Sequence, residues 1–260
     1  MTQIWRLLPF QVANGTMQMA IDLWCLDQLI AGHQPPTVRF YQWSPAAISL
    51  GYHQHDWPAA WHQMAHYGQS IDLVRRPTGG RAVLHQGDLT YAITMPLVGS
   101  RRLAYRQICD ALVSAWQSLG VELQYGQGGR DYRHQPNCFA LSTTADLTTS
   151  AGYKLIGSAQ LRRDRHLLQH GSIRLWPDWA LHQQVFGTAA LPQSPAPSVI
   201  PLQAHQAWLE TLIALMQAEL AKAVGATFAV IPLTPTEQVE IAARAQELFI
   251  PPSSLPRREA

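Results

Sequence analysis

The order of helix-like and strand-like segments is the feature that most constrains how this chain can fold. Apolar residues recur at helical spacing over residues 17–30, 101–119 and 209–220. Clusters of short strand-like runs lie between these helices, instead of single strands in regular alternation with them. This order predicts an α+β (mixed α/β) fold with a mixed sheet flanked by helices.

Several local patterns place the remaining elements. Runs of strand-forming residues occur at 38–43, 47–51 and 73–76, and alternation at 89–95 is typical of a half-buried strand. From Cys138 to Ile173 we expect several short strands with tight turns, followed by a loop over 188–203. Near the end, the segment Thr-Pro-Thr-Glu at 234–237 has the signature of a helix capping box.

Length and composition narrow the class of protein. The 260 residues, 47% of them apolar, predict a single domain over 1–260, with 204–260 as a helical C-terminal extension. A net charge of +2 gives no general case for binding nucleic acid, and no apolar run approaches the ~18 residues that a membrane span needs. The first residues lack a secretory signal pattern, and three widely spaced cysteines do not suggest disulfides. We therefore expect a cytoplasmic protein.

A glycine pair follows the predicted strand at 73–76. Gly79 and Gly80 would let the backbone approach a ligand closely, and the adjacent Arg75 and Arg76 suit a phosphate or a carboxylate. A hairpin turn with exposed arginines explains these residues equally well. The loop is not a Walker loop, because the Gly-Lys-Ser/Thr ending is missing.

A second set of chemically active residue types follows in the expected strand cluster. Cys138 stands at a loop-to-strand junction, whereas Cys25 and Cys109 fall within predicted helices and are expected to be packed. Lys154 precedes an apolar strand. Taken singly, such a cysteine is usually a small buried hydrophobe and such a lysine a surface charge. The pair His53 and His55 lacks a completing carboxylate or thiol, so no metal site is expected.

Taken together and in order, these stretches resemble the biotin/lipoate ligase catalytic-domain family. Residues 75–89 match its central signature of arginines, Thr-Gly-Gly and a following His, and residues 154–160 match Lys-x-x-Gly-Ser-Ala-Gln, with His-Gly-Ser at 170–172. Met19 and Asp22 match an early helix. The resemblance covers roughly residues 10–190 and implies an acyl group bound in a tunnel under the Thr-Gly-Gly loop, with Lys154 at the acyl carbonyl.

Within this family the chain is most similar to the cysteine-dependent, LipM-type octanoyltransferases. That branch carries its nucleophilic cysteine in a Cys-Phe pair upstream of the lysine, and Cys138 lies 16 residues before Lys154 (154 − 138 = 16). Classical octanoyltransferases place the cysteine shortly before the His-Gly pair. Leu167 occupies that position here, which excludes their mechanism.

The resemblance implies transfer of octanoyl from octanoyl-acyl carrier protein to the lysine of a lipoyl domain protein, through a thioester on Cys138. The acceptor would be the glycine cleavage H protein or the acyltransferase subunit of a 2-oxoacid dehydrogenase. No cofactor is then needed. Two alternatives stay open: a lipoate-protein ligase, which would use ATP and Mg²⁺, and an amidotransferase that moves octanoyl between lipoyl carriers.

The resemblance also implies a set of site residues. Cys138 and Lys154 would be catalytic. The substrate-binding residues would be Arg75, Arg76, Thr78, Gly79, Gly80, His85, Gly157, Ser158, Ala159, His170 and Gly171. A module that binds lipoyl domains without chemistry is disfavoured, because the lysine and the glycine loop are both present.

Overall fold

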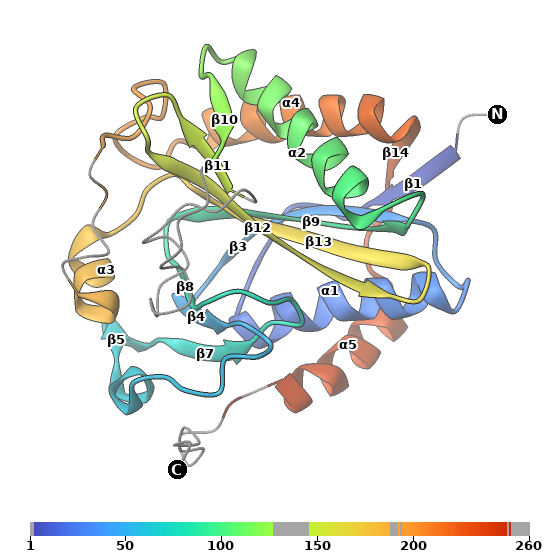
Figure 1. The fold of residues 1–260 in the computed structure, drawn as a ribbon. Helices are drawn as coiled ribbons and strands as arrows, with labels where there is room; N and C mark the ends of the chain where they lie inside the picture. Colours follow the sequence, from blue (N-terminus) through green and yellow to red (C-terminus); the bar gives the residue numbers. More distant parts are fainter. Residues whose placement is uncertain (1–2, 127–145, 188–191, 193, 249, 251–260) are drawn as a thin grey trace.

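A computed structural model of the chain describes residues 3–126, 146–187, 192, 194–248 and 250. In these residues the main sheet has nine strands, in the order β10-β11-β12-β13-β9-β3-β1-β14, and β2 pairs with β3. Helices α2 and α4 cover one face of this sheet, and α1 and α5 lie on the other (Figure 1). The predicted mixed sheet flanked by helices is confirmed.

The main sheet is antiparallel in its centre and parallel at one edge, where β3, β1 and β14 run in the same direction. Its strands are β1 (Gln3–Leu7), β2 (Gln11–Ala13), β3 (Thr37–Trp43), β9 (Asp88–Pro96), β10 (Leu123–Tyr125), β11 (Asp146–Thr149), β12 (Lys154–Arg163), β13 (His166–Arg174) and β14 (Ala226–Val230).

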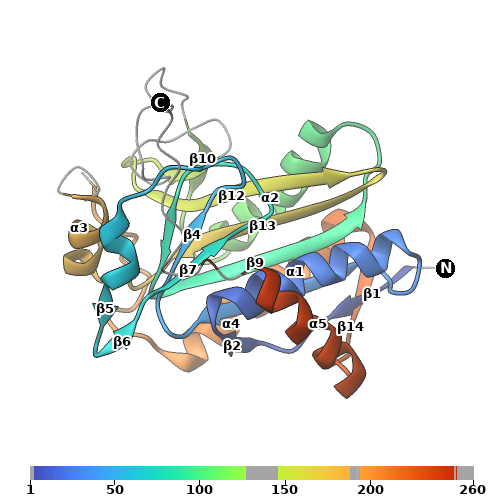
Figure 2. The ribbon, with the colours of Figure 1, turned by 90° about the horizontal axis from the view of Figure 1, so that it is seen from below.

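A smaller sheet lies beside α1, on the face of the main sheet opposite α2 and α4 (Figure 2). Its order is β7 (Asp72–Arg75), β4 (Ala47–Leu50) and β8 (Val83–His85). The chain between β4 and β7 adds a short 3-10 helix, Ala59–Gln63, and the two-residue strands β5 (Ala65–His66) and β6 (Gln69–Ser70). The loop that joins β7 to β8 carries the Thr-Gly-Gly sequence, so this sheet positions the glycine pair.

The helices are α1 (Gly15–Ile30), α2 (Arg101–Gln117), α3 (Trp179–Phe186), α4 (Gln206–Val224) and α5 (Pro235–Leu248). All but α3 were predicted from the sequence. The apolar stripe of α2 is buried against the sheet, with Ile108, Leu112 and Trp116 each 0% exposed. Cys25 and Cys109 are buried in their helices, as expected. No helix in the described ranges is long and apolar enough to cross a bilayer.

The segment after residue 146 differs from its prediction. We expected several short strands, but β12 and β13 are ten and nine residues long and form one extended hairpin. Small and polar residues interrupt the apolar pattern in the middle of both strands, at 157–160 and 169–172. All of those residues except Gln169 line a cavity, whereas Gln169 is buried and hydrogen-bonded to Tyr91. The cavity therefore explains why the hydrophobic pattern suggested strand ends where none occur.

The C-terminal segment is joined to the N-terminus by the parallel pairing of β14 with β1, which the sequence did not predict. Next to this pairing, Arg6 donates to both carboxylate oxygens of Glu237 at 2.9 Å, and Arg6 is 2% exposed. Glu237 also completes the predicted capping box, since its carboxylate accepts from the backbone N–H of Thr234 at 2.7 Å. Helix α5 is thus fixed to the sheet by one buried ion pair.

Replacement of Glu237 by alanine should therefore leave a buried guanidinium without its carboxylate. We expect Glu237→Ala to lower the free energy of unfolding by about 3 kcal/mol in urea titrations. The control is Glu219→Ala, which removes an ion pair to a lysine that is 71% exposed; its expected cost is below about 0.5 kcal/mol. Equal losses in the two variants would contradict this role for the pair.

The same pair predicts a pH dependence. Hydrogen bonds from Arg6 lower the pKa of Glu237 below its ordinary value of 4.5. A carboxylate with a depressed pKa stabilises the fold above its unfolded pKa and loses that contribution as the pH falls through the folded value. The stability gap between wild type and Glu237→Ala should thus narrow below pH 4.5.

Candidate active site

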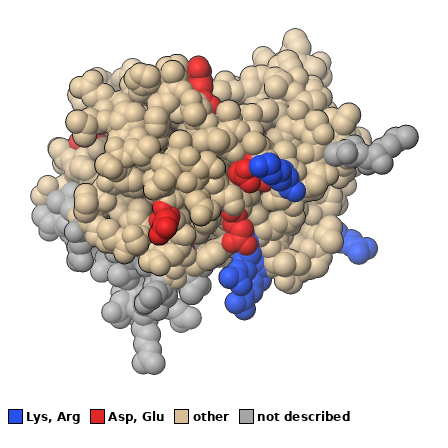
Figure 3. Space-filling view, turned by 90° about the horizontal axis from the view of Figure 1, so that it is seen from above, with Lys and Arg blue, Asp and Glu red and all other residues tan. Residues whose placement is uncertain are grey.

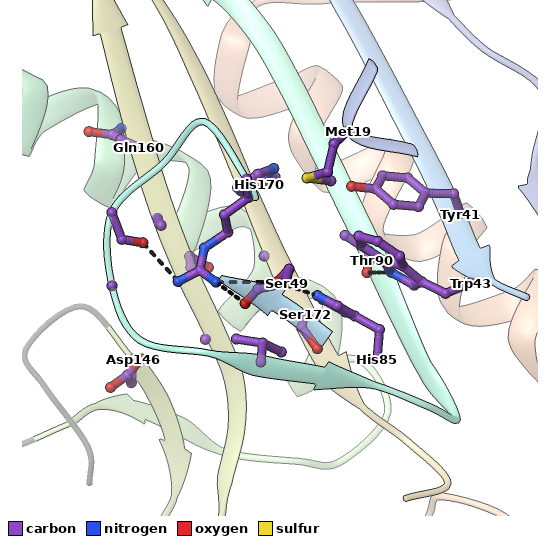
Figure 4. A pocket seen from close by; sticks show the side chains of 18 residues that line it. Met19, Tyr41, Trp43, Ser49, His85, Thr90, Asp146, Gln160, His170 and Ser172 are labelled. Atoms are coloured by element: carbon purple, nitrogen blue, oxygen red, sulfur yellow. Dashed lines mark hydrogen bonds between the residues drawn. The ribbon is translucent and has the colours of Figure 1, made fainter. Parts of the chain in front are cut away.

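A cavity of about 220 Å³ lies between the main sheet and the small sheet, under the glycine loop (Figure 4). Its walls come from α1, from the main-sheet strands β3, β9, β11, β12 and β13, and from β4, β8 and the glycine loop of the small sheet. The lining residues are Met19, Tyr41, Trp43, Ser49, Arg76, Gly79, Gly80, Val83, His85, Thr90, Asp146, Gly157, Ser158, Ala159, Gln160, His170, Gly171 and Ser172.

Glycines make the space for this cavity. A Cβ on Gly51 would stand 1.9 Å from the backbone oxygen of Gly80, so only glycine lets β4 end directly against the glycine loop. A Cβ on Gly171 would meet the Oγ of Ser158 at 2.5 Å and the ring of Tyr91 at 2.6 Å. Backbone therefore forms part of both the roof and the floor of the cavity.

The two arginines before the glycine pair shape the loop. Arg76 is buried and donates to the backbone oxygens of Ser49 and Gly79 at 2.8 and 2.9 Å. Arg75 donates to the backbone oxygen of Gly51 at 2.9 Å. These bonds tie the loop to β4 and give the arginines a structural part, besides the anion binding that the sequence suggested.

A buried polar relay connects helix α1 to the same loop. The carboxylate of Asp22 accepts from Arg39 at 2.8 Å and from the Tyr41 hydroxyl at 2.9 Å, and it lies 2.8 Å from Nδ1 of His170. On the other side of the ring, Nε2 of His170 is 2.6 Å from the Thr78 hydroxyl. His170 thus bridges α1 and the loop, and its ring lines the cavity between them.

A second histidine forms part of the cavity wall. The His85 ring stacks on Trp43 with centroids 3.8 Å apart, and its two nitrogens lie 2.9 Å from the Ser49 hydroxyl and 2.8 Å from Asp88 (Figure 4). Burial lowers the pKa of His85. The ring is therefore neutral near pH 7, and this wall presents aromatic surface without a formal charge.

An ion pair stands at one end of the cavity. Lys154 Nζ lies 2.9 Å from a carboxylate oxygen of Asp146, and both side chains are at most 5% exposed. Asp146 lines the cavity, and the antiparallel pairing of β11 with β12 brings it next to the lysine. Lys154 is not itself among the described residues that line the cavity, and its Nζ is linked to the cavity wall through the Asp146 carboxylate.

The structure brings most of the predicted site residues together. Those that line the cavity are Arg76, Gly79, Gly80, His85, Gly157, Ser158, Ala159, His170 and Gly171. Thr78 is buried and bonded to His170, and Arg75 lines an adjoining groove. Cys138 lies outside the described residues.

Sequence reasoning missed several lining residues. Tyr41 and Trp43 could have been found, because alternate residues of a predicted strand share a face. Asp146 gave no local signal, since its role depends on a strand pairing. In the described ranges, no group of three or more His, Cys, Asp or Glu side chains is arranged to hold a metal ion.

Several known proteins are similar to this chain in sequence. Residues 14–229 match the model of the lipoyl protein ligase A/B catalytic domain. The octanoyltransferase LipM of Moorella thermoacetica is 41% identical over 186 residues, and that of Clostridioides difficile is 40% identical over 179 residues. Each match covers 66% of this chain, and 66% and 65% of those relatives, so the chain spans slightly less than two thirds of their length.

Solved structures agree on the fold. The bipartite lipoate protein ligase of Thermoplasma acidophilum superimposes with a TM-score of 0.68 at 19% identity, covering 95% of this chain and 92% of that one. A lipoate-protein ligase A bound with ATP gives a TM-score of 0.71 at 19% identity, with 95% and 94% covered. Because the family model matches residues 14–229, which are most of the chain, the chain belongs to the lipoyl protein ligase A/B catalytic domain family.

Proposed function

We propose that this protein transfers octanoyl from an acyl carrier protein to the lysine of a lipoyl domain, by way of a thioester on Cys138. The observation that carries the proposal is the buried Lys154–Asp146 pair beside a largely apolar cavity. The relatives at about 40% identity, whose names are octanoyltransferases, support the same reaction. The acceptor would be the glycine cleavage H protein or the acyltransferase subunit of a 2-oxoacid dehydrogenase.

The shape and polarity of the cavity suit an alkyl chain. Met19, Trp43 and Val83 provide apolar walls, and the neutral His85 ring adds aromatic surface. Apolar contacts of this kind favour burial of methylene groups at about 0.8 kcal/mol each. The glycine loop would lie against the acyl chain, because Gly79 and Gly80 line the cavity. Backbone N–H groups of Gly79, Gly80 or Ser158 are candidate donors to a carbonyl oxygen.

Two of the three cysteines are poor nucleophiles. Burial raises the thiol pKa of Cys25 and of Cys109 to about 12, and each side chain lies within a packed helix. Because the thiolate is the reactive form, neither cysteine would react at a useful rate near neutral pH. This leaves Cys138 as the candidate, in agreement with its position before Lys154 in the sequence.

The reaction would proceed in two balanced steps. The Cys138 thiolate attacks the carbonyl carbon of the octanoyl thioester, and the carrier leaves as a thiol after it takes up a proton. The neutral amine of the lipoyl lysine then attacks the enzyme thioester, loses a proton and forms an amide, and Cys138 leaves as a thiolate. The Lys154 ammonium, held by Asp146, would offset the negative charge that develops in each step.

The donor requirement tests this function. We expect octanoylation of a lipoyl domain from octanoyl-acyl carrier protein with a metal chelator present and no nucleotide, because the thioester already activates the acyl group. Free octanoate or lipoate with ATP and Mg²⁺ should give no product. Intact mass spectrometry measures both reactions. ATP-dependent lipoylation from the free acid would instead identify a ligase, and transfer only from an octanoylated lipoyl carrier an amidotransferase.

The nucleophile can be tested by paired cysteine variants. Cys138→Ser should abolish transfer, and an octanoyl adduct that hydroxylamine removes should form on wild type, but not on this variant, when the acceptor is omitted. Cys109→Ser is the matched control, because it changes a fully buried thiol and should lower the melting temperature more than the rate. Wild-type transfer by Cys138→Ser would eliminate the thioester mechanism.

Lys154 can be tested through its charge and shape. Lys154→Ala should reduce kcat by about a hundredfold or more, in the range seen when an electrostatic stabiliser is lost. Lys154→Arg should not restore the rate, because a guanidinium is larger and planar and would not place its charge where the ammonium group lies. Rates close to wild type in Lys154→Ala would mean that the active site lies elsewhere.

A further inference from the structure

Two open grooves adjoin the acyl cavity and are unusually rich in arginine. The first is lined by Arg75, Arg76, Arg101, Arg162 and Arg163, with Glu247 as its acidic residue. The second is lined by Arg101, Arg102 and Arg106 together with two tyrosines. Gln160 lines both grooves and the cavity itself, so the three spaces meet at this residue. The arginines therefore line the grooves that meet the cavity at Gln160, a place called its mouth from here on.

Most of this positive charge is not neutralised locally. Among the described residues, no carboxylate lies within ion-pair distance of Arg101, Arg102, Arg106 or Arg162, and all four are exposed. Arg163 differs, because it is paired with Asp27. Positive side chains are sparse elsewhere on the face formed by α2 and α4 (Figure 3). The charge is thus concentrated beside the cavity on a chain whose net charge is only +2.

The position of Arg101 and Arg102 strengthens this field. They are the first two residues of α2, where the helix dipole is positive and acidic side chains are usually favoured. Two arginines at this end are locally unfavourable, and their charge adds to the positive end of the helix dipole. Ser100 caps the first turn by accepting from the N–H of Leu103. The side chain next to them, Leu103, is 61% exposed and offers an apolar contact.

From this we infer that the arginine rim, defined here as Arg101, Arg102, Arg106 and Arg162, is the docking surface for the protein that donates the acyl group, and that it binds the carrier's acidic surface and the phosphate of its thioester arm. The inference rests on the proposed function. A carrier-bound thioester reaches its catalyst on an arm that begins with a phosphodiester, whereas the acceptor lysine is an ordinary side chain without phosphate. Arginines that converge on the cavity mouth at a helix N-terminus match the first chemistry better than the second.

The test compares two donors with the double variant Arg101→Glu/Arg102→Glu. One donor is octanoyl-acyl carrier protein, and the other is octanoyl-N-acetylcysteamine, which carries neither phosphate nor protein. The ratio of kcat/KM for the first donor to that for the second should fall about tenfold or more, and the loss should shrink as salt is added. Glutamate is favoured at a helix N-terminus, so the variant should fold.

Lys222→Glu is the control, because it reverses one charge at an exposed lysine on α4, which is half the charge change of the double variant; its ratio should equal that of wild type. An unchanged ratio in the double variant would overturn the inference. So would a rise in KM for the lipoyl domain without a change for the donor, which would assign the rim to the acceptor.

The failure of the proposed function would look different, since wild type would then transfer from neither donor. In that case the rim is tested by the fluorescence anisotropy of labelled octanoyl-acyl carrier protein, without an acceptor. Binding that is weakened about tenfold by the double variant supports the inference, and equal binding overturns it.

Discussion

The cavity depends on one buried carboxylate, that of Asp22. A charged group that is 1% exposed is costly unless donors surround it, and here Arg39, Tyr41 and His170 do so. Burial and the neighbouring carboxylate raise the pKa of Tyr41, so the phenol stays a donor. These bonds fix α1, β3 and β13 relative to one another, and the contact of His170 with Thr78 connects them to the glycine loop. The Asp22 carboxylate therefore helps to hold the glycine loop over the cavity and also orients the elements that form its walls.

The site is made mostly of residues that would be unremarkable if each were considered alone. The glycines let backbone atoms occupy positions where side chains normally pack. The stacked rings of His85 and Trp43 form one apolar wall. The interruption of the apolar pattern in β12 and β13 has the same origin, since those strands supply the floor. A small volume whose walls are largely apolar favours a chain of methylenes, although Arg76 and Asp146 also line it. Charge is kept to the Lys154–Asp146 end and to the mouth.

The local sequence pattern predicted all helices but α3. An apolar stripe such as that of α2, or a cap such as Thr234, is determined by residues that are close together in the sequence. The order of the signatures likewise predicted nine of the eighteen residues that line the cavity. Local pattern could not predict the pairing of β1 with β14 or the Lys154–Asp146 contact. Both depend on which strands become neighbours in the sheet. The bonds from Arg75 and Arg76 to backbone oxygens were not foreseen either, since a guanidinium that binds a phosphate and one that binds a carbonyl look identical in sequence.

The parallel pairing of β1 with β14 has a consequence for how the chain folds as it is synthesised. Residues 3–7 emerge long before residues 226–230, which form the strand that covers one side of them, and the carboxylate that pairs with Arg6 follows at Glu237. Until those residues leave the ribosome, β1 has an open edge and Arg6 lacks its counterion. The hairpin of β12 and β13 can pair with its neighbour β9 before those residues are synthesised. The centre of the sheet can therefore form earlier during translation, whereas its parallel edge closes only after residues 226–237 have been synthesised.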